Sequence, residues 1–153
     1  MNTNEVANLI GHMSFQYSYL DYLISNIVWS SLELKKDVGV IITGSLDIYP
    51  KLDMAISLLE ELDNYPNLLS SLKSLKNRMQ KTNSFVTKRN LYIHGVFSSR
   101  DKDSIVMIES HRNKKNRKKK PIEQTDIQQT LNEILNEIKI LIPLMKKENI
   151  NID

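Results

Sequence analysis

The chain has 153 residues, of which 41% are hydrophobic and 25% charged, a composition typical of one globular domain with its own core. It contains no cysteine, which excludes disulfides, zinc sites built on thiolates and cysteine nucleophiles. No apolar run is long enough to span a bilayer and no basic-then-apolar leader begins the chain, so we expect a cytoplasmic protein without a membrane partner. We expect a single domain over residues 1–153.

The net charge of +3 hides a strong local asymmetry. The stretch RNKKNRKKK, residues 112–120, holds seven basic residues and no acidic one, so the rest of the chain is net negative. A local cluster of this kind can bind a polyanion even when the whole protein is nearly neutral.

Residues 6–29 carry two apolar stripes at helical spacing. The first stripe recurs at steps of three and four and comprises Val6, Leu9, Ile10, Met13, Tyr17, Leu20, Ile24 and Ile27. The second is aromatic, lies roughly opposite the first at about 100° per residue, and comprises Phe15, Tyr19, Tyr22 and Trp29. We predict one helix that needs cover on both sides. The glycine-bearing stretch KKDVGVIITGS, residues 35–45, breaks the pattern and predicts a connection.

Two further helices are predicted before residue 95. One begins after Asp47, which can act as its N-cap, and tolerates Pro50 in its first turn. Its apolar face comprises Leu52, Ala55, Ile56, Leu59 and Leu62. The next starts at Pro66, and since no helix breaker appears before Gly95, we predict a length of about 29 residues. Its stripe comprises Leu68, Leu72, Leu75, Met79, Thr82 and Val86.

The periodicity changes over residues 96–111, which indicate a strand, a polar turn and a second strand. After the basic run, Thr125 and Gln128 predict a capping box for a last helix, in which Pro143 predicts a kink. The stripe of this helix comprises Leu131, Ile134, Leu135, Ile138, Leu141, Ile142 and Met145. The predicted fold is all-α, an up-and-down four-helix bundle with a small β-hairpin inserted before the last helix. The hairpin and the basic segment together occupy about residues 96–121.

The stretch KRNLYIHGVF, residues 88–97, places three functional side chains at the end of the third predicted helix. Asn90 continues the apolar stripe, while Arg89 and His94 lie on its two shoulders, about 140° apart. Gly95 can end the helix as a C-terminal cap, which leaves the His94 ring room to turn inward. A structural explanation stands beside this one, because Arg and His in a last turn complement the helix dipole.

The motif RNLYIH resembles the Arg-polar-x-x-x-His signature of the HEPN superfamily (higher eukaryotes and prokaryotes nucleotide-binding domains). That family has helical up-and-down bundles with this motif near the end of a long third helix. Many of its members are metal-independent ribonucleases of toxin–antitoxin, phage-defence and RNA-processing systems. The resemblance implies that Arg89 and His94 are a catalytic pair, that Asn90 is the polar residue beside them, and that neither a metal nor another cofactor takes part.

These residue types suit RNA cleavage in which the 2′-hydroxyl of the substrate is the nucleophile. An imidazole can accept or return that proton near neutral pH, and a guanidinium can hold the phosphate through two donors. The expected products carry a 2′,3′-cyclic phosphate and a 5′-hydroxyl. The resemblance, with which this chemistry agrees, implies a metal-independent endoribonuclease of HEPN type in a bacterial toxin or phage-defence system. Two alternatives are a non-catalytic module of the same fold that binds RNA, nucleotide or protein, and an unrelated helical interaction domain.

Three kinds of partner are expected. The basic run could be a solvated loop or a membrane-surface patch, but beside the motif it favours contacts with the RNA backbone through Arg112, Lys114, Lys115, Arg117, Lys118 and Lys119. The aromatic stripe of Phe15, Tyr19, Tyr22 and Trp29 predicts a homodimer interface, unless the hairpin or the glycine-bearing segment of the same chain covers it. The resemblance adds an antitoxin or regulatory protein.

Overall fold

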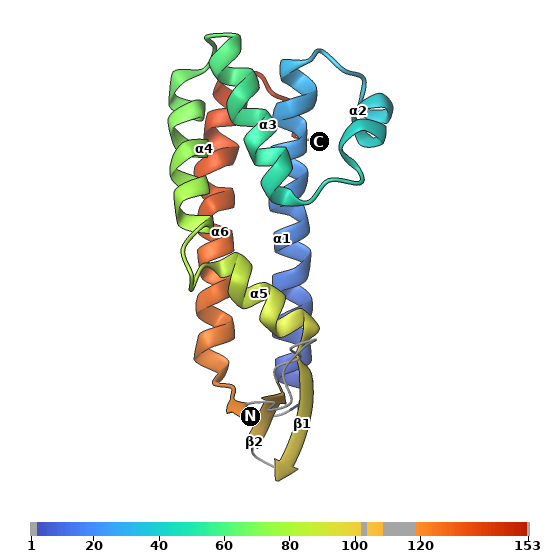
Figure 1. The fold of residues 1–153 in the computed structure, drawn as a ribbon, viewed down its shortest axis with the longest axis vertical. Helices are drawn as coiled ribbons and strands as arrows, with labels where there is room; N and C mark the ends of the chain where they lie inside the picture. The colour runs from blue at the N-terminus through green and yellow to red at the C-terminus, as the bar shows by residue number, and fades with distance from the viewer. Residues whose placement is uncertain (1–2, 102–103, 109–118, 153) are drawn as a thin grey trace. The chain divides into compact units, whose positions relative to one another are not determined.

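The computed structural model describes residues 3–101, 104–108 and 119–152 (Figure 1). In this part of the chain there are six helices and three short strands. Two helices are long, α1 (Thr3–Ser31) and α6 (Gln124–Lys147). None of the described helices is both long and apolar enough to cross a bilayer.

The chain divides into two compact units, each made of segments that are distant in sequence. The sheet unit contains residues 1–16 and 82–134, and the helical unit contains residues 17–81 and 135–153. Because α1 and α6 each cross a boundary, both helices contribute to both units. The single domain over 1–153 stays a prediction.

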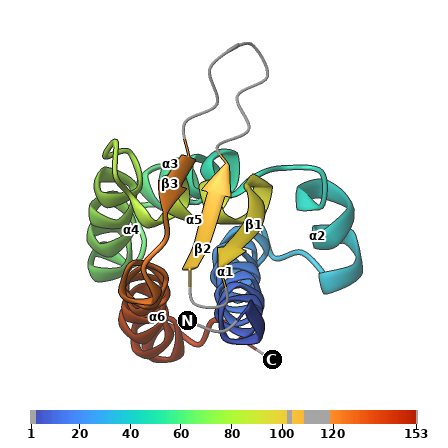
Figure 2. The ribbon, with the colours of Figure 1, turned by 90° about the horizontal axis from the view of Figure 1, so that it is seen from below.

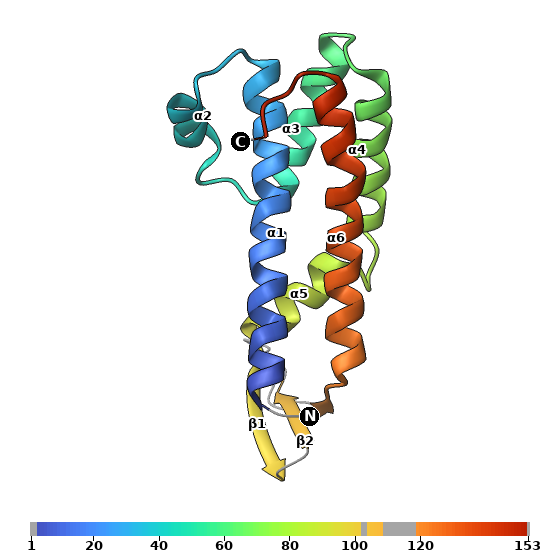
Figure 3. The ribbon, with the colours of Figure 1, turned by 180° about the vertical axis from the view of Figure 1, so that it is seen from behind.

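The helical unit combines the later parts of α1 and α6 with α2 (Lys36–Thr43), α3 (Ile48–Glu61) and α4 (Pro66–Met79). Figures 1 and 3 show α3 and α4 as an antiparallel pair joined by a short turn, with α2 standing apart from them beside α1. Arg78 on α4 is bound to Glu137 on α6 through two contacts, Nε–Oε1 at 2.5 Å and Nη2–Oε2 at 2.8 Å. The buried core of this unit includes Leu20, Ile24, Ile27, Leu52, Leu59, Leu72, Met79, Leu141 and Met145.

The sheet unit combines the early parts of α1 and α6 with α5 (Phe85–His94) and three strands. These are β1 (Val96–Asp101), β2 (Ser104–Ile108) and β3 (Lys119–Pro121), which lie side by side in that order, with each pair antiparallel (Figure 2). Val96 is opposite Ile108, and the register shifts between Ser99 and Asp101. The buried residues of this unit include Val6, Met13, Phe85, Val86, Tyr92, Ile122, Ile127, Leu131 and Ile134.

The predicted four-helix bundle with one β-hairpin is wrong in its elements, although helices do make up most of the described chain, as expected. The third predicted helix is two helices, α4 and α5, because the chain leaves the helix after Met79 and starts again at Ser84. The Ser84 hydroxyl accepts a hydrogen bond from the backbone N–H of Thr87 at 3.2 Å, and this N-cap begins α5. Moreover, β3 makes the sheet three-stranded.

A second difference is the helix α2, which replaces the connection expected over residues 35–45. Its inner side is held by Trp29 of α1, whose Nε1 donates to the Thr43 hydroxyl at 3.0 Å. That hydroxyl donates in turn to the carbonyl of Gly39 at 3.0 Å. A Cβ on Gly39 would lie 2.5 Å from the indole ring, so only glycine allows this approach. Tertiary contacts thus stabilise a helix that its β-branched sequence does not favour.

The predicted apolar stripes of the long helices are buried at most positions, with Leu9, Ile10, Tyr17, Leu135 and Ile142 only partly buried, and the predicted cap of α6 differs. In α6, Leu131, Ile134, Leu141 and Met145 are all at most 2% exposed. The expected capping box is wrong, because Thr125 lies inside the helix and its hydroxyl donates to the Glu123 carboxylate at 3.4 Å.

Candidate functional site

The candidate site lies on α5, a ten-residue helix in the sheet unit with a defined beginning and end. It begins at the Ser84 cap and ends at His94, and Gly95 then has φ −72° and ψ 147°. This is ordinary extended backbone leading into β1, so Gly95 does not use the left-handed conformation of a helix C-cap. The helix therefore ends because the chain enters a strand.

The buried face of α5 determines which of the motif residues are exposed to solvent. Phe85, Val86 and Tyr92 are at most 7% exposed and define the inward face. Arg89 is half-buried at the edge of that face, whereas Asn90 and His94 are exposed. The expectation that Asn90 continues an apolar stripe and that His94 turns inward is therefore wrong. The projection from Leu68 fails because the helix that begins there ends at Met79 and a new helix begins at Phe85.

Arg89 and Asn90 are brought together. The Arg89 Nη1 donates a hydrogen bond to the Asn90 Oδ1 at 3.0 Å. This bond orients the Asn90 carboxamide with its oxygen toward the guanidinium. The NH₂ group of Asn90 therefore points away from Arg89, where it can donate to a ligand. A guanidinium and an amide held side by side form a pair of donors suited to phosphate oxygens.

His94 lies five residues after Arg89, which places the two side chains about 140° apart around the helix axis. The imidazole is exposed in the last turn of α5. It can therefore exchange protons with a bound substrate, but it does not share the direction of Arg89 along the helix surface.

Side chains on one face of α5 attach it to the first turns of α6. Lys88 Nζ is 3.6 Å from Glu133 Oε1, and Tyr92 lies near the buried Thr130. The Thr130 hydroxyl donates to the backbone carbonyl of Asp126 at 2.9 Å. Burial, together with the nearby carboxylates of Asp126 and Glu133, raises the pKa of Tyr92, although the Thr130 hydrogen bond acts in the opposite direction.

The predicted RNA-binding run falls mostly outside the described residues. Arg112, Lys114, Lys115, Arg117 and Lys118 belong to that undescribed segment. Lys119 begins β3, where its backbone is paired with Ile108 of β2. RNA contact by this run stays a prediction.

The predicted dimer stripe is covered in part by the same chain. Trp29 is 5% exposed because α2 packs on it, and it is therefore an internal residue and not a surface one. Tyr19 and Tyr22 are half-buried, with ring centroids 6.4 Å apart, and Lys36 Nζ lies 5.1 Å above the Tyr22 ring. Phe15 is 69% exposed. Of the two covers considered from sequence, the glycine-bearing segment covers the Trp29 end of the stripe.

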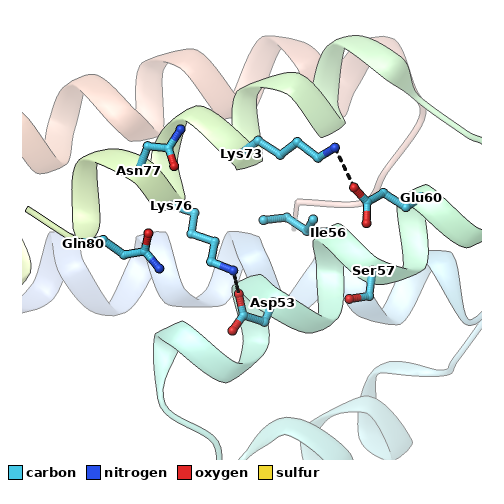
Figure 4. Close-up of a pocket in the computed structure, with 8 residues that line it drawn as sticks. All are labelled: Asp53, Ile56, Ser57, Glu60, Lys73, Lys76, Asn77 and Gln80. Atoms are coloured by element: carbon cyan, nitrogen blue, oxygen red, sulfur yellow. Dashed lines mark ion pairs between the residues drawn. The ribbon is translucent and has the colours of Figure 1, made fainter.

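A surface hollow lies elsewhere, between α3 and α4 of the helical unit (Figure 4). Its volume is about 700 Å³. Lys73 and Lys76 of α4 reach across it to Glu60 and Asp53 of α3, each at 2.6 Å. Since these charges neutralise one another and most are well exposed, we assign the hollow to helix pairing and not to a ligand. Among the described residues, no group of three His, Cys, Asp or Glu side chains could hold a metal ion.

Comparisons with protein-family models, curated proteins and solved structures gave no match for this chain. The functional argument therefore depends on the α5 motif and its surroundings. Sequence reasoning missed Ser84, Tyr92 and Thr130, the residues that begin α5 and attach it to α6. The run TNSF, residues 82–85, was the available signal for Ser84, because a serine before two apolar residues is a typical N-cap.

Proposed function

We propose that this protein is a metal-independent endoribonuclease of HEPN type that acts in a bacterial toxin or phage-defence system. The observation that carries the proposal is the arrangement on α5, where Arg89 is hydrogen-bonded to Asn90 and an exposed His94 ends the same helix. The substrate is RNA, because the proposed reaction needs a 2′-hydroxyl next to the scissile phosphate.

In the proposed reaction the 2′-oxygen attacks the adjacent phosphorus. The imidazole of His94 accepts the 2′-hydroxyl proton as the O2′–P bond forms. The P–O5′ bond breaks, the 5′-oxygen takes up a proton, and the products end in a 2′,3′-cyclic phosphate and a 5′-hydroxyl. The proton that His94 accepts can be returned to the 5′-oxygen, so no external reagent is consumed.

Arg89 and Asn90 have the role of stabilising charge on the phosphate oxygens. The half-buried position of Arg89 supports this role, because attraction between a guanidinium and a phosphate grows as water is excluded. The basic run between β2 and α6 would hold the RNA backbone without selecting bases, since lysine and arginine contact phosphates irrespective of sequence. A homodimer and an antitoxin or regulatory protein belong to the same proposal.

The proposal is tested by RNA cleavage with purified protein in the presence of a chelator. Arg89→Ala and His94→Ala are each expected to lower the cleavage rate by roughly a hundredfold or more, because each removes a group that acts on the reacting atoms. His12→Ala is the matched control, since His12 is an exposed histidine on α1 whose ring contacts only its helix neighbour Gln16 in the hydrogen bonds described, at 3.3 Å.

Circular dichroism of each variant establishes that it is folded, and end-group analysis identifies the cyclic phosphate. Cleavage at the wild-type rate by either folded variant, or wild-type cleavage that stops on chelation, contradicts the assignment.

The alternative is a non-catalytic HEPN-fold module that binds RNA, nucleotide or a protein partner. The 140° separation of Arg89 and His94 favours it, because one copy of α5 directs the two side chains differently. In that case wild-type protein binds RNA without cleaving it. Arg89→Ala weakens binding while His94→Ala leaves the affinity unchanged.

A further inference from the structure

Helix α2, which lies beside α1 in the helical unit, carries its apolar side chains on its exposed side (Figures 1 and 3). Its buried residues are Gly39 and Thr43, and neither contributes an aliphatic side chain to the core. Its four aliphatic residues are all between 42% and 81% exposed: Val38, Val40, Ile41 and Ile42. A surface helix normally buries its apolar face, so α2 packs on α1 without the hydrophobic contribution that usually holds such a helix.

The contacts described between α2 and α1 are small ones. Trp29 Nε1 donates to the Thr43 hydroxyl at 3.0 Å, and the indole lies against the backbone at Gly39. Lys36 Nζ lies 5.1 Å from the centre of the Tyr22 ring, and a cation–π contact of this kind is weak where the cation is exposed, as Lys36 is. The attachment of α2 therefore centres on Trp29.

Helix α2 also has little stability of its own. It is only 8 residues long, and a helix so short is not stable in water by itself. It begins after Lys35 without a side-chain cap, and a glycine and several β-branched residues lower its helix propensity. Once its contacts with Trp29 are lost, α2 therefore unwinds, whereas the core of the helical unit stays buried because α2 supplies none of its apolar side chains.

We propose that α2 is a strap that opens by local unfolding while the rest of the helical unit stays folded, and that it controls access to the aromatic surface of Trp29 and Tyr22. These two rings form an edge-to-face pair with centroids 6.0 Å apart. Opening the strap exposes the pair to solvent, and aromatic side chains of this kind are enriched in the cores of protein interfaces. The closed strap keeps the indole from any partner. This inference does not depend on the proposed endoribonuclease function.

The test is native-state hydrogen exchange of the whole chain, followed by NMR from zero to moderate urea. The amides of Gly39 and Gly44 report on α2, because they donate to the carbonyls of Lys35 and Val40. The amides of the fully buried core residues of α1, Ile24 and Ile27, report on the helical unit. We expect the α2 amides to exchange at least a hundredfold faster than those of α1. Their exchange should depend little on urea, since a local opening exposes little surface.

Three variants separate opening of the strap from a general loss of stability. Thr43→Val keeps the side-chain shape but removes the hydroxyl that binds Trp29, and should speed exchange of the α2 amides by roughly five- to tenfold. Ile41→Ala raises helix propensity at a position that is 81% exposed, and should slow the same exchange by roughly twofold. Ser25→Ala is the matched control, because this buried hydroxyl donates to the Asp21 carbonyl within α1, and it should leave exchange of α2 unchanged.

Exchange of the Trp29 indole N–H is a second readout, and it is unambiguous because the chain has one tryptophan. This proton is held by the Thr43 hydroxyl, so in Ile41→Ala its exchange should slow in parallel with that of the α2 amides. If the α2 amides exchange as slowly as those of Ile24 and Ile27, with the same urea dependence, α2 opens only on global unfolding and the inference is overturned. Unchanged exchange of α2 in Thr43→Val also overturns it, because Trp29 then does not hold the strap closed.

Discussion

The Tyr92 side chain is largely buried, and it lies near two carboxylates. Burial disfavours the tyrosinate, and the negative charges of Asp126 and Glu133 disfavour it further, so the pKa of Tyr92 is raised in the folded protein. The unfolded chain ionises this residue at its ordinary value, near 10. Above that pH the unfolded state loses the proton first, so alkali favours unfolding.

We therefore predict an alkaline loss of stability that depends on this one residue. The contribution of Tyr92 is fully present below about pH 10 and declines as pH rises from there through the raised pKa of the folded state. Urea denaturation from pH 8 to 11 should show a steeper fall in the free energy of unfolding for wild type than for Tyr92→Phe. Parallel slopes for wild type and Tyr92→Phe would exclude this linkage.

Only some features of the candidate site could be predicted from the sequence. Neighbouring positions on a helix made the proximity of Arg89 and Asn90 predictable, and their hydrogen bond is formed. The outward direction of His94 was not predictable, because it depends on how α5 is rotated against α6. The structure buries Phe85 and Tyr92 of α5, and tertiary burial of this kind is not revealed by periodicity within one helix.

At the scale of the elements, the packing of α2 depends on a single residue of another helix, Trp29 of α1. Gly39 of α2 faces Trp29 of α1, the one tryptophan of the chain. Because Gly39 has no side chain, the two helices can approach closely at this point. The outer side of α2 has no such fit, and Val38, Val40, Ile41 and Ile42 are between 42% and 81% exposed. The stability of α2 thus derives from its inner contacts with Trp29.

Gly39→Ala is therefore expected to destabilise the protein by about 1–3 kcal/mol, because a methyl group 2.5 Å from the indole forces α2 away from α1. Gly11→Ala is the matched control, since Gly11 lies inside α1 with no atom within 4 Å of an added Cβ. Removing glycine from a helix interior there should stabilise the protein by up to about 1 kcal/mol.

Urea unfolding followed by Trp29 fluorescence measures both effects. In Gly39→Ala the native emission should also shift to longer wavelength as the indole gains contact with water. Equal midpoints for the two alanine variants would refute the close packing of α2 on Trp29.

The sequence did not predict the break between α4 and α5 or the helix α2, and the two features were missed for different physical reasons. The break between α4 and α5 was missed because Met79, Thr82 and Val86 keep a helical step across it, and the apolar pattern hid the Ser84 cap. The helix α2 was missed because its glycine and β-branched residues disfavour a helix locally, and only its contacts with Trp29 reverse that preference. The stripes of α1, α3, α4 and α6 were predictable, since burial follows their periodicity.

At the scale of the whole molecule, fewer residues of the aromatic stripe are accessible for the predicted homodimer interface than the sequence suggested. Trp29 is internal and Tyr19 and Tyr22 are half-buried, so Phe15, at 69% exposure, is the aromatic side chain best placed to contact a second copy. We expect Phe15→Glu to convert a dimer into folded monomers, because it puts a charge into an apolar contact.

Trp29→Glu, by contrast, should unfold or strongly destabilise the protein whatever its oligomeric state, because it buries a charge beneath α2. Light scattering at high micromolar concentration measures the mass of wild type and of Phe15→Glu, and circular dichroism monitors folding. A wild-type protein that scatters as a monomer rules out the dimer.

Each unit is built from segments that are distant in sequence, and this affects how the chain can fold while it is being synthesised. Residues 17–81 emerge early, but the helical unit also needs residues 135–147 of α6, including the buried Leu141 and Met145. The sheet unit likewise waits for the first turns of that helix. During translation the apolar faces of α1, α3 and α4 are therefore made long before the element that completes them. We therefore expect that neither unit completes its core before α6 has been synthesised, and that the nascent chain exposes apolar segments of the kind that chaperones bind.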